Sequence, residues 1–158
     1  MVRGARYLYL GLAWAFVVGV ILQVFLVGLG LFADSEYLGW HAGFGWSILH
    51  LWPLLILVVS PLARAGRTGI LQATALAITV WIVPILAVLR AEAPVAAAFH
   101  PVGALLAFWL GIVVARGATR LAGTSDAATP PTRGELALVA VVVVVLLFLS
   151  LSGSPTEV

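Results

Sequence analysis

Residues 7–32 read YLYLGLAWAFVVGVILQVFLVGLGLF, a run with one side-chain amide and no charge. A helix needs about 20 apolar residues to cross the hydrocarbon core of a bilayer, and this run is longer. It also exceeds the apolar region of about 7–15 residues in a cleaved signal peptide, although Arg3 and Arg6 precede it as in such peptides. We therefore expect Tyr7 to Phe32 to form a retained transmembrane helix.

The rest of the chain has a similar composition. Of 158 residues, 63% are apolar and 9% are charged, with a mean hydropathy of +1.19, whereas a soluble domain carries about 25% charged residues. The eight basic residues are all arginines scattered between apolar runs, which excludes a nucleic-acid-binding patch. The absence of cysteine excludes disulfides, thiolate catalysis and iron–sulfur ligation. The composition indicates an integral membrane protein whose partner is the lipid bilayer, and it excludes a soluble enzyme.

Four further apolar runs follow, separated by short polar breaks and one longer segment rich in turn residues. Short connections favour antiparallel neighbours, so we expect an all-α integral membrane fold whose first four spans form an up-down bundle. The fifth run has no polar side chain from Leu136 to Leu149, which is typical of a peripheral helix that faces lipid. The further predicted spans are Leu38 to Leu62, Thr68 to Leu89, Pro94 to Ala115, and Glu135 to Leu151. The predicted units are a four-helix core over 1–116, a cytoplasmic linker over 117–134, and the fifth helix with a short outer tail over 135–158.

The arginines predict the topology, because cytoplasmic loops carry an excess of basic residues. When the connections are assigned alternately to two sides, only Arg90 falls on one of them. The other side holds Arg3, Arg6, Arg64, Arg67, Arg116, Arg120 and Arg133. We therefore expect a multi-pass protein of the cell membrane with its N-terminus in the cytoplasm and its C-terminus outside.

Three histidines interrupt the apolar spans, and ionisable residues inside a membrane are functional candidates. Counted from the flanking arginines at about 1.5 Å per residue, His50 and His100 lie near one level, and His41 lies close to the outer interface. Gln23 lies in the outer half of its span, where its amide can bond an imidazole. His41 and His50 point to nearly opposite sides of a regular helix, so both face one ligand only if a proline such as Pro53 distorts that helix.

The surroundings of His100 favour a flat ligand. Its helical face carries small residues, which either let helices approach closely or leave a slot, and a histidine among them favours the slot. Haem iron takes one nitrogen from each side of the porphyrin, as imidazoles on two facing helices can supply. Copper is a second possibility, and a third is that each histidine only hydrogen-bonds a neighbouring helix. The pattern predicts haem b, with His100, His50 and His41 as candidate iron ligands and Gln23, Gly103 and Ala104 as further cofactor contacts.

Several short motifs resemble one repeat of the haem A synthase family. Leu22-Gln23 and Gly28-Leu29-Gly30 precede a second span that opens on His41, and the similarity continues with Leu71-Gln72 and with His100 in the fourth span. Each repeat of that family is a four-helix bundle with haem-binding histidines on its second and fourth helices. The resemblance covers residues 10 to 116 and implies His41 and His100 as the ligand pair.

The same region resembles small uncharacterised four-helix membrane proteins that combine a Gly-to-His stretch with a His-Pro pair. Here these are Gly45 to His50 and His100-Pro101. The synthases have two bundles and an outer-loop carboxylate or cysteine pair, whereas this chain has one bundle and no cysteine. The resemblance therefore does not extend to the synthase activity.

Two functions follow as expectations. The first is a b-type haem protein of the membrane that acts in electron transfer or haem handling; two histidines saturate the iron, so an enzyme is not favoured. The alternative is a non-enzymatic structural or accessory subunit of a larger membrane complex or homo-oligomer. A transporter is less favoured, because no Asp, Glu or Arg lies deep in a span.

Overall fold

The computed structural model describes residues 1–124 and 129–152, and these form helices and their connections. Five helical segments are long and apolar enough to cross a membrane, which confirms the five predicted spans. The helices are α1 (Val2–Phe32), α2 (Glu36–Phe44), the π-helical turn η1 (Gly45–Leu49), α3 (Trp52–Leu62), α4 (Gly66–Val88), α5 (Pro94–Ala97), α6 (Phe99–Ala122) and α7 (Arg133–Ser152).

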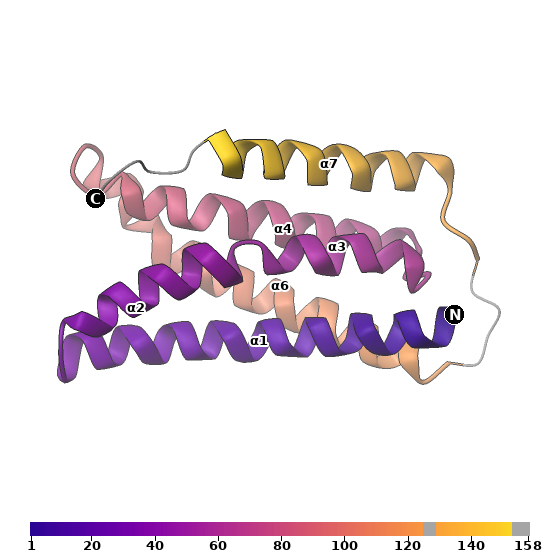
Figure 1. Ribbon diagram of the computed structural model, residues 1–158, viewed down its shortest axis with the longest axis horizontal. Coiled ribbons are helices and arrows are strands. Elements are labelled where there is room, and N and C mark those ends of the chain that lie inside the picture. Colours follow the sequence, from indigo (N-terminus) through magenta and orange to yellow (C-terminus); the bar gives the residue numbers. More distant parts are fainter. Residues whose placement is uncertain (125–128, 153–158) are drawn as a thin grey trace.

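The first four spans pack in a ring. Helix α1 packs against α6, α6 against α4, α4 against α3, and α3 against α1. Helix α7 lies alongside α3 and α4, outside this ring (Figure 1). The connections define two ends of the molecule: an arginine-rich end, where α1 begins and α6 ends, and a histidine end, which holds the 33–35 and 89–93 connections together with His41 and His100.

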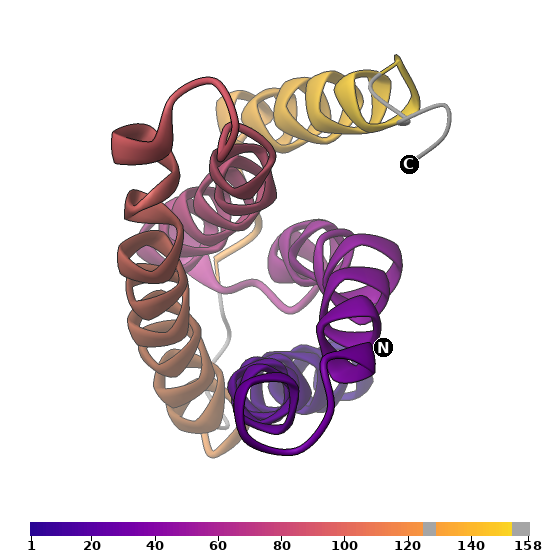
Figure 2. The same cartoon turned by 90° about the vertical axis from the view of Figure 1, so that its left-hand side faces the viewer.

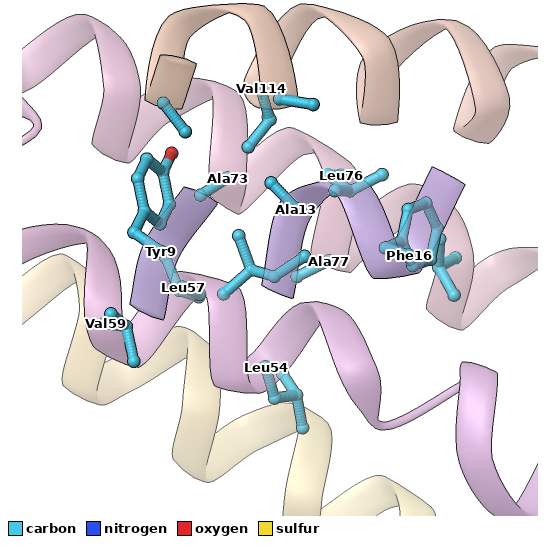
Figure 3. Close-up of a cluster of buried hydrophobic side chains, with 14 of the residues drawn as sticks. Tyr9, Ala13, Phe16, Leu54, Leu57, Val59, Ala73, Leu76, Ala77 and Val114 are labelled. Carbon is cyan, nitrogen blue, oxygen red and sulfur yellow. The ribbon is translucent and has the colours of Figure 1, made fainter. Parts of the chain in front are cut away.

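The buried core occupies the arginine-rich half of the ring. The buried residues of α1 lie between Arg6 and Val20, those of α4 between Ile70 and Val80, and those of α6 between Ala107 and Ala118. Helix α2, at the other end, has no buried residue. Figure 3 shows part of this core, with labelled side chains Tyr9, Ala13, Phe16, Leu54, Leu57, Val59, Ala73, Leu76, Ala77 and Val114. Most of the buried side chains thus lie in one half of the ring.

Close helix approach makes this packing possible. A Cβ atom added to Gly111 of α6 would lie 2.9 Å from the ring of Phe16 on α1. At the same end, Nη1 of the buried Arg6 donates to the carbonyl oxygen of Thr124 at 2.7 Å, which joins the start of α1 to the residues after α6. Helices α1 and α6 are therefore held together by both packing and a charged hydrogen bond.

The second span is not the single regular helix that the sequence predicts. It changes from α2 to the π-helical turn η1, where the backbone N–H of His50 donates to the carbonyl of Gly45 at 2.8 Å. Helix α3 then starts at Trp52, with Pro53 in its first turn. Proline lacks the N–H that would bond to the preceding turn, so a new helix begins there. The directions of His41 and His50 therefore do not follow the regular helical rule.

Other boundaries also differ from the expected ones. Helix α1 begins at Val2 and α6 continues to Ala122, because arginine, alanine and leucine favour helix beyond the apolar run. The fourth span is divided at Ala98, since Pro101 cannot donate a backbone bond to Ala97. The outer tail predicted after α7, at 153–158, lies outside the described residues, as do residues 125–128 of the predicted linker.

Candidate functional site

The histidine end brings His41 of α2 and His100 of α6 together. Their ring centroids are 6.3 Å apart, and the ring planes are inclined at 76°. Among the described residues, α2 packs only against α1 and η1, and Figure 2, viewed from this end, shows α2 and α6 on different sides of the ring of helices. The two imidazoles therefore approach each other across a part of the ring where their own helices do not pack.

Each imidazole of this pair bonds to a further helix: His41 bonds to α1 and His100 bonds to α4. Nδ1 of His41 donates to the backbone carbonyl of Gln23 on α1 at 3.1 Å, and Nδ1 of His100 donates to the carbonyl of Val83 on α4 at 2.8 Å. A carbonyl oxygen only accepts, so Nδ1 must carry the proton in both rings. In a neutral imidazole this leaves a lone pair on Nε2, the usual arrangement of a histidine that ligates a metal.

Gln23 lies beside this pair with part of its amide unused. Its Oε1 atom is buried and has no hydrogen-bond partner among the described residues. A Cβ atom on Gly45 would meet the Nε2 atom of Gln23, so a larger residue at this position would require the amide to move. The structure therefore places Gln23 beside His41, in the same half of the ring as His100.

The small residues expected to leave a slot have another role at Gly103. A Cβ atom there would lie 2.9 Å from a methyl of Val83, so α4 already occupies the space. Ala104 is the next residue and is partly buried. At Gly103 the small side chain allows close approach of α4 and α6, and contact of Gly103 and Ala104 with a cofactor stays a prediction. The carbonyl of the same Val83 accepts the hydrogen bond from His100.

His50 belongs to a different cluster. It is only 6% exposed; the ring of Trp46 stacks on it with centroids 5.0 Å apart, and the ring of Trp81 on α4 is 6.3 Å away. Its Nε2 lies 3.1 Å from Oγ of Ser150 on α7, and Nε1 of Trp81 donates to the same oxygen at 3.2 Å. The structure therefore directs His50 to the fifth helix rather than to His100, although counting along regular helices places His50 and His100 at one level.

The proton positions in this cluster follow from the hydroxyl. Ser150 has one hydrogen, which it donates to the carbonyl of Leu146 at 2.8 Å. Trp81 can only donate, so Nε2 of His50 must be the second donor to Ser150. Nδ1 of His50 then carries a lone pair, and it is buried with no hydrogen-bond partner among the described residues. His50 thus acts as a link between the second and fifth spans.

Sequence reasoning overlooked Ser150 and Trp81. Ser150 was detectable as a hydroxyl near the end of a run of Leu, Val, Ala and Phe, but no local pattern connects it with His50 one hundred residues earlier. A tryptophan within an apolar run is typical of a packing residue, so Trp81 gives no local signal either. Both act through contacts that tertiary structure alone creates.

The described residues contain no group of three or more His, Cys, Asp or Glu side chains suited to a metal ion. The pair of His41 and His100 offers two nitrogens, which is the number that an iron porphyrin takes from a protein. Comparison with protein-family models, with curated proteins and with solved structures finds no match for this chain. The resemblance to the haem A synthase family therefore stays a prediction.

Proposed function

We propose that this chain is a membrane b-type haem protein with His41 and His100 as the axial ligands, acting in electron transfer or haem handling. In this proposal the first four spans form an up-down bundle with the N-terminus in the cytoplasm. The fifth helix is peripheral, the C-terminus lies outside, and the histidine end lies toward the outer face of the cell membrane.

The observation that carries the proposal is the separation of the two rings. A metal–imidazole bond is about 2 Å long, so the centres of two rings on opposite sides of one metal lie about 6 Å apart. The observed separation of 6.3 Å agrees with this value. His41 and His100 would each hold the iron through one ring nitrogen, and this does not require parallel rings, so the interplanar angle of 76° is compatible with the proposal.

The hydrogen bonds at the pair give a second line of support. Both Nδ1 atoms are committed to backbone carbonyls, which fixes the tautomer and the orientation of each ring. A bond from Nδ1–H to a carbonyl also raises the basicity of Nε2, the ligating atom. Gln23 would lie next to the group through its backbone carbonyl, which accepts from Nδ1 of His41.

Haem held in this way supplies a one-electron couple to the protein. Two histidine ligands leave no open position on the iron, so electron transfer is favoured over oxygen or substrate chemistry. The residues of this chain would hold the two ligating nitrogens and orient the two rings through the carbonyls of Gln23 and Val83.

The test is an ultraviolet–visible spectrum and a pyridine haemochrome assay of the purified protein, before and after added haem. We expect a Soret band that shifts on reduction in the wild type. His41→Ala and His100→Ala should each remove the spectrum of a six-coordinate haem, and added imidazole should restore it in His100→Gly. His50→Ala is the matched control and should keep the spectrum, because His50 contacts α7.

A wild-type preparation that stays colourless after haem is added refutes the proposal and favours the accessory-subunit alternative. Loss of the spectrum in His50→Ala with retention in His41→Ala would refute the ligand assignment, because the predicted pair would then be the wrong one.

A further inference from the structure

The first turns of α6, at the histidine end, have few residues packed against other helices. The buried residues of α6 begin at Ala107. Within residues 101–106, Gly103 and Ala104 are partly buried and the other four are exposed. His100 lies just before this stretch, in the first turn of α6, and its hydrogen-bond acceptor is on α4. The orientation of its imidazole therefore depends on how close this end of α6 lies to α4.

One residue of α4, Val83, makes two different contacts with this end of α6. Its backbone carbonyl accepts a hydrogen bond from Nδ1 of His100 at 2.8 Å. Its Cγ2 methyl would lie 2.9 Å from a Cβ atom added to Gly103. His100 and Gly103 are three residues apart and so lie on one side of the helix. The missing side chain of Gly103 and the hydrogen bond of the imidazole thus concern the same residue of α4.

This hydrogen bond leaves little room for a change in the distance between the two helices. Two carbon atoms in contact lie about 3.5–4.0 Å apart, so Gly103→Ala requires the methyl of Val83 to move by about 0.6 Å or more. Valine is branched at Cβ, so its methyl cannot turn away without a change of rotamer. An outward movement of α4 by this distance lengthens the bond from His100 to about 3.4 Å, beyond the range of about 2.7–3.2 Å for N–H···O hydrogen bonds.

The corresponding contact beside His41 is less rigid. Gly45 follows His41 by four residues, and a Cβ atom there would meet Nε2 of Gln23, whose backbone carbonyl accepts from His41. That nitrogen is at the end of a flexible side chain, which can change rotamer without a movement of α1. The rigid contact is therefore the one between Gly103 and Val83.

We propose that Gly103 is a positioning residue for His100, because it sets the separation of α4 and α6 at which Nδ1–H of His100 reaches the Val83 carbonyl. This bond keeps the proton on Nδ1 and leaves Nε2 free as the ligating atom. The role does not require Gly103 to touch a cofactor. The effect on haem rests on the proposed function, whereas the tautomer of His100 follows from the packing alone.

The first test uses the cofactor-free protein in detergent micelles. NMR of protein with isotope-labelled histidine nitrogens reports which ring nitrogen carries the proton, and His100→Ala identifies the signals of that ring. We expect Nδ1–H in the wild type and its loss in Gly103→Ala. Adding Val83→Ala to Gly103→Ala removes the methyl, keeps the carbonyl and should restore Nδ1–H. Gly43→Ala, where a Cβ meets nothing within 4 Å, is the matched control and should keep the wild-type tautomer.

The second test uses the haem-loaded protein. The bond from Nδ1–H makes the ligating nitrogen more basic and so favours ferric iron; its loss in Gly103→Ala should raise the reduction potential. We expect the preference for ferric over ferrous iron to fall about 3-fold to 10-fold, which is about 30 to 60 mV for one electron. Adding Val83→Ala should reverse the shift. A loss of packing alone would reduce the amount of bound haem without such a reversible shift.

Three results would overturn the inference. The first is a wild-type tautomer in Gly103→Ala. The second is a double variant that is folded by circular dichroism but lacks Nδ1–H, and the third is a double variant that does not fold, because removing the methyl removes the clash. If Gly103→Ala alone fails to fold, the double variant decides by the same measurement. A wild type that binds no haem refutes the proposed function only, since the tautomer test needs no haem.

Discussion

Replacing Ser150 by alanine is expected to loosen the fifth helix from the other spans. The Ser150 hydroxyl accepts hydrogen bonds from Nε2 of His50 at 3.1 Å and from Nε1 of Trp81 at 3.2 Å. These two bonds cross from the second and third spans to α7, which otherwise presents mainly apolar side chains to α3 and α4. Ser150→Ala removes both bonds and leaves two N–H donors without this acceptor.

The expected loss follows from the cost of each bond. Hydrogen bonds between helices in membranes contribute about 0.6 kcal/mol on average and about 1.7 kcal/mol at most. His50 is buried, so water cannot easily replace the lost partner. Ser150→Ala should therefore lower the free energy of unfolding by about 1 to 3 kcal/mol. Ser150→Thr keeps the hydroxyl and should stay within about 0.5 kcal/mol of the wild type.

The assay is reversible unfolding in mixed micelles of mild detergent and dodecyl sulfate, followed by circular dichroism. A double-mutant cycle of His50→Ala with Ser150→Ala isolates the coupling between the two side chains, which we expect to be about 0.6 to 1.7 kcal/mol. If Ser150→Ala behaves like Ser150→Thr, or if the coupling energy is zero, His50 does not link the second span to α7 and the reasoning is refuted.

Two further predictions concern packing and topology. Gly111→Val forces a side chain into the ring of Phe16 and should cost about 1 to 3 kcal/mol in the same unfolding assay; Gly11→Ala, where a Cβ meets nothing within 4 Å, should cost far less, and equal costs would contradict the packing. Because the chain has no native cysteine, Asp34→Cys should react with an impermeant maleimide added outside cells, and Thr132→Cys only after permeabilisation; the reverse pattern would invert the proposed topology.

Membrane class and the five spans could be predicted because each is a local property. A run of about 20 apolar residues is sufficient to specify a spanning helix, whatever it packs against. The end of a run is less well defined, since helix continues into the interface wherever the residues favour it, as from Ala115 to Ala122. The depth of a residue and the side of the helix on which it lies can also be counted from the sequence, but the count assumes a regular helix.

That assumption fails in the second span, where the helix is interrupted and His50 contacts Ser150 of α7. A π-helical turn contains one more residue than an α-helical turn. Each residue of an α-helix turns the chain by about 100°, so the extra residue changes the directions of the side chains before the turn relative to those after it. The break at Leu51, before Pro53, redirects the helix again. The sequence of the span does not show how far these breaks rotate the side chains. The rotation also depends on contacts with other helices, such as that of Gly45 with Gln23.

The sequence by itself determined that the chain belongs in a lipid bilayer, how many spans it has, and which residue types are available for a site. Tertiary structure alone decided that His41 meets His100, that His50 bonds to Ser150 on α7, and that Gly103 brings two helices together. The physical reason is that burial in lipid depends on the composition of each segment. The meeting of two side chains depends on the relative rotation and separation of helices that are distant in the chain.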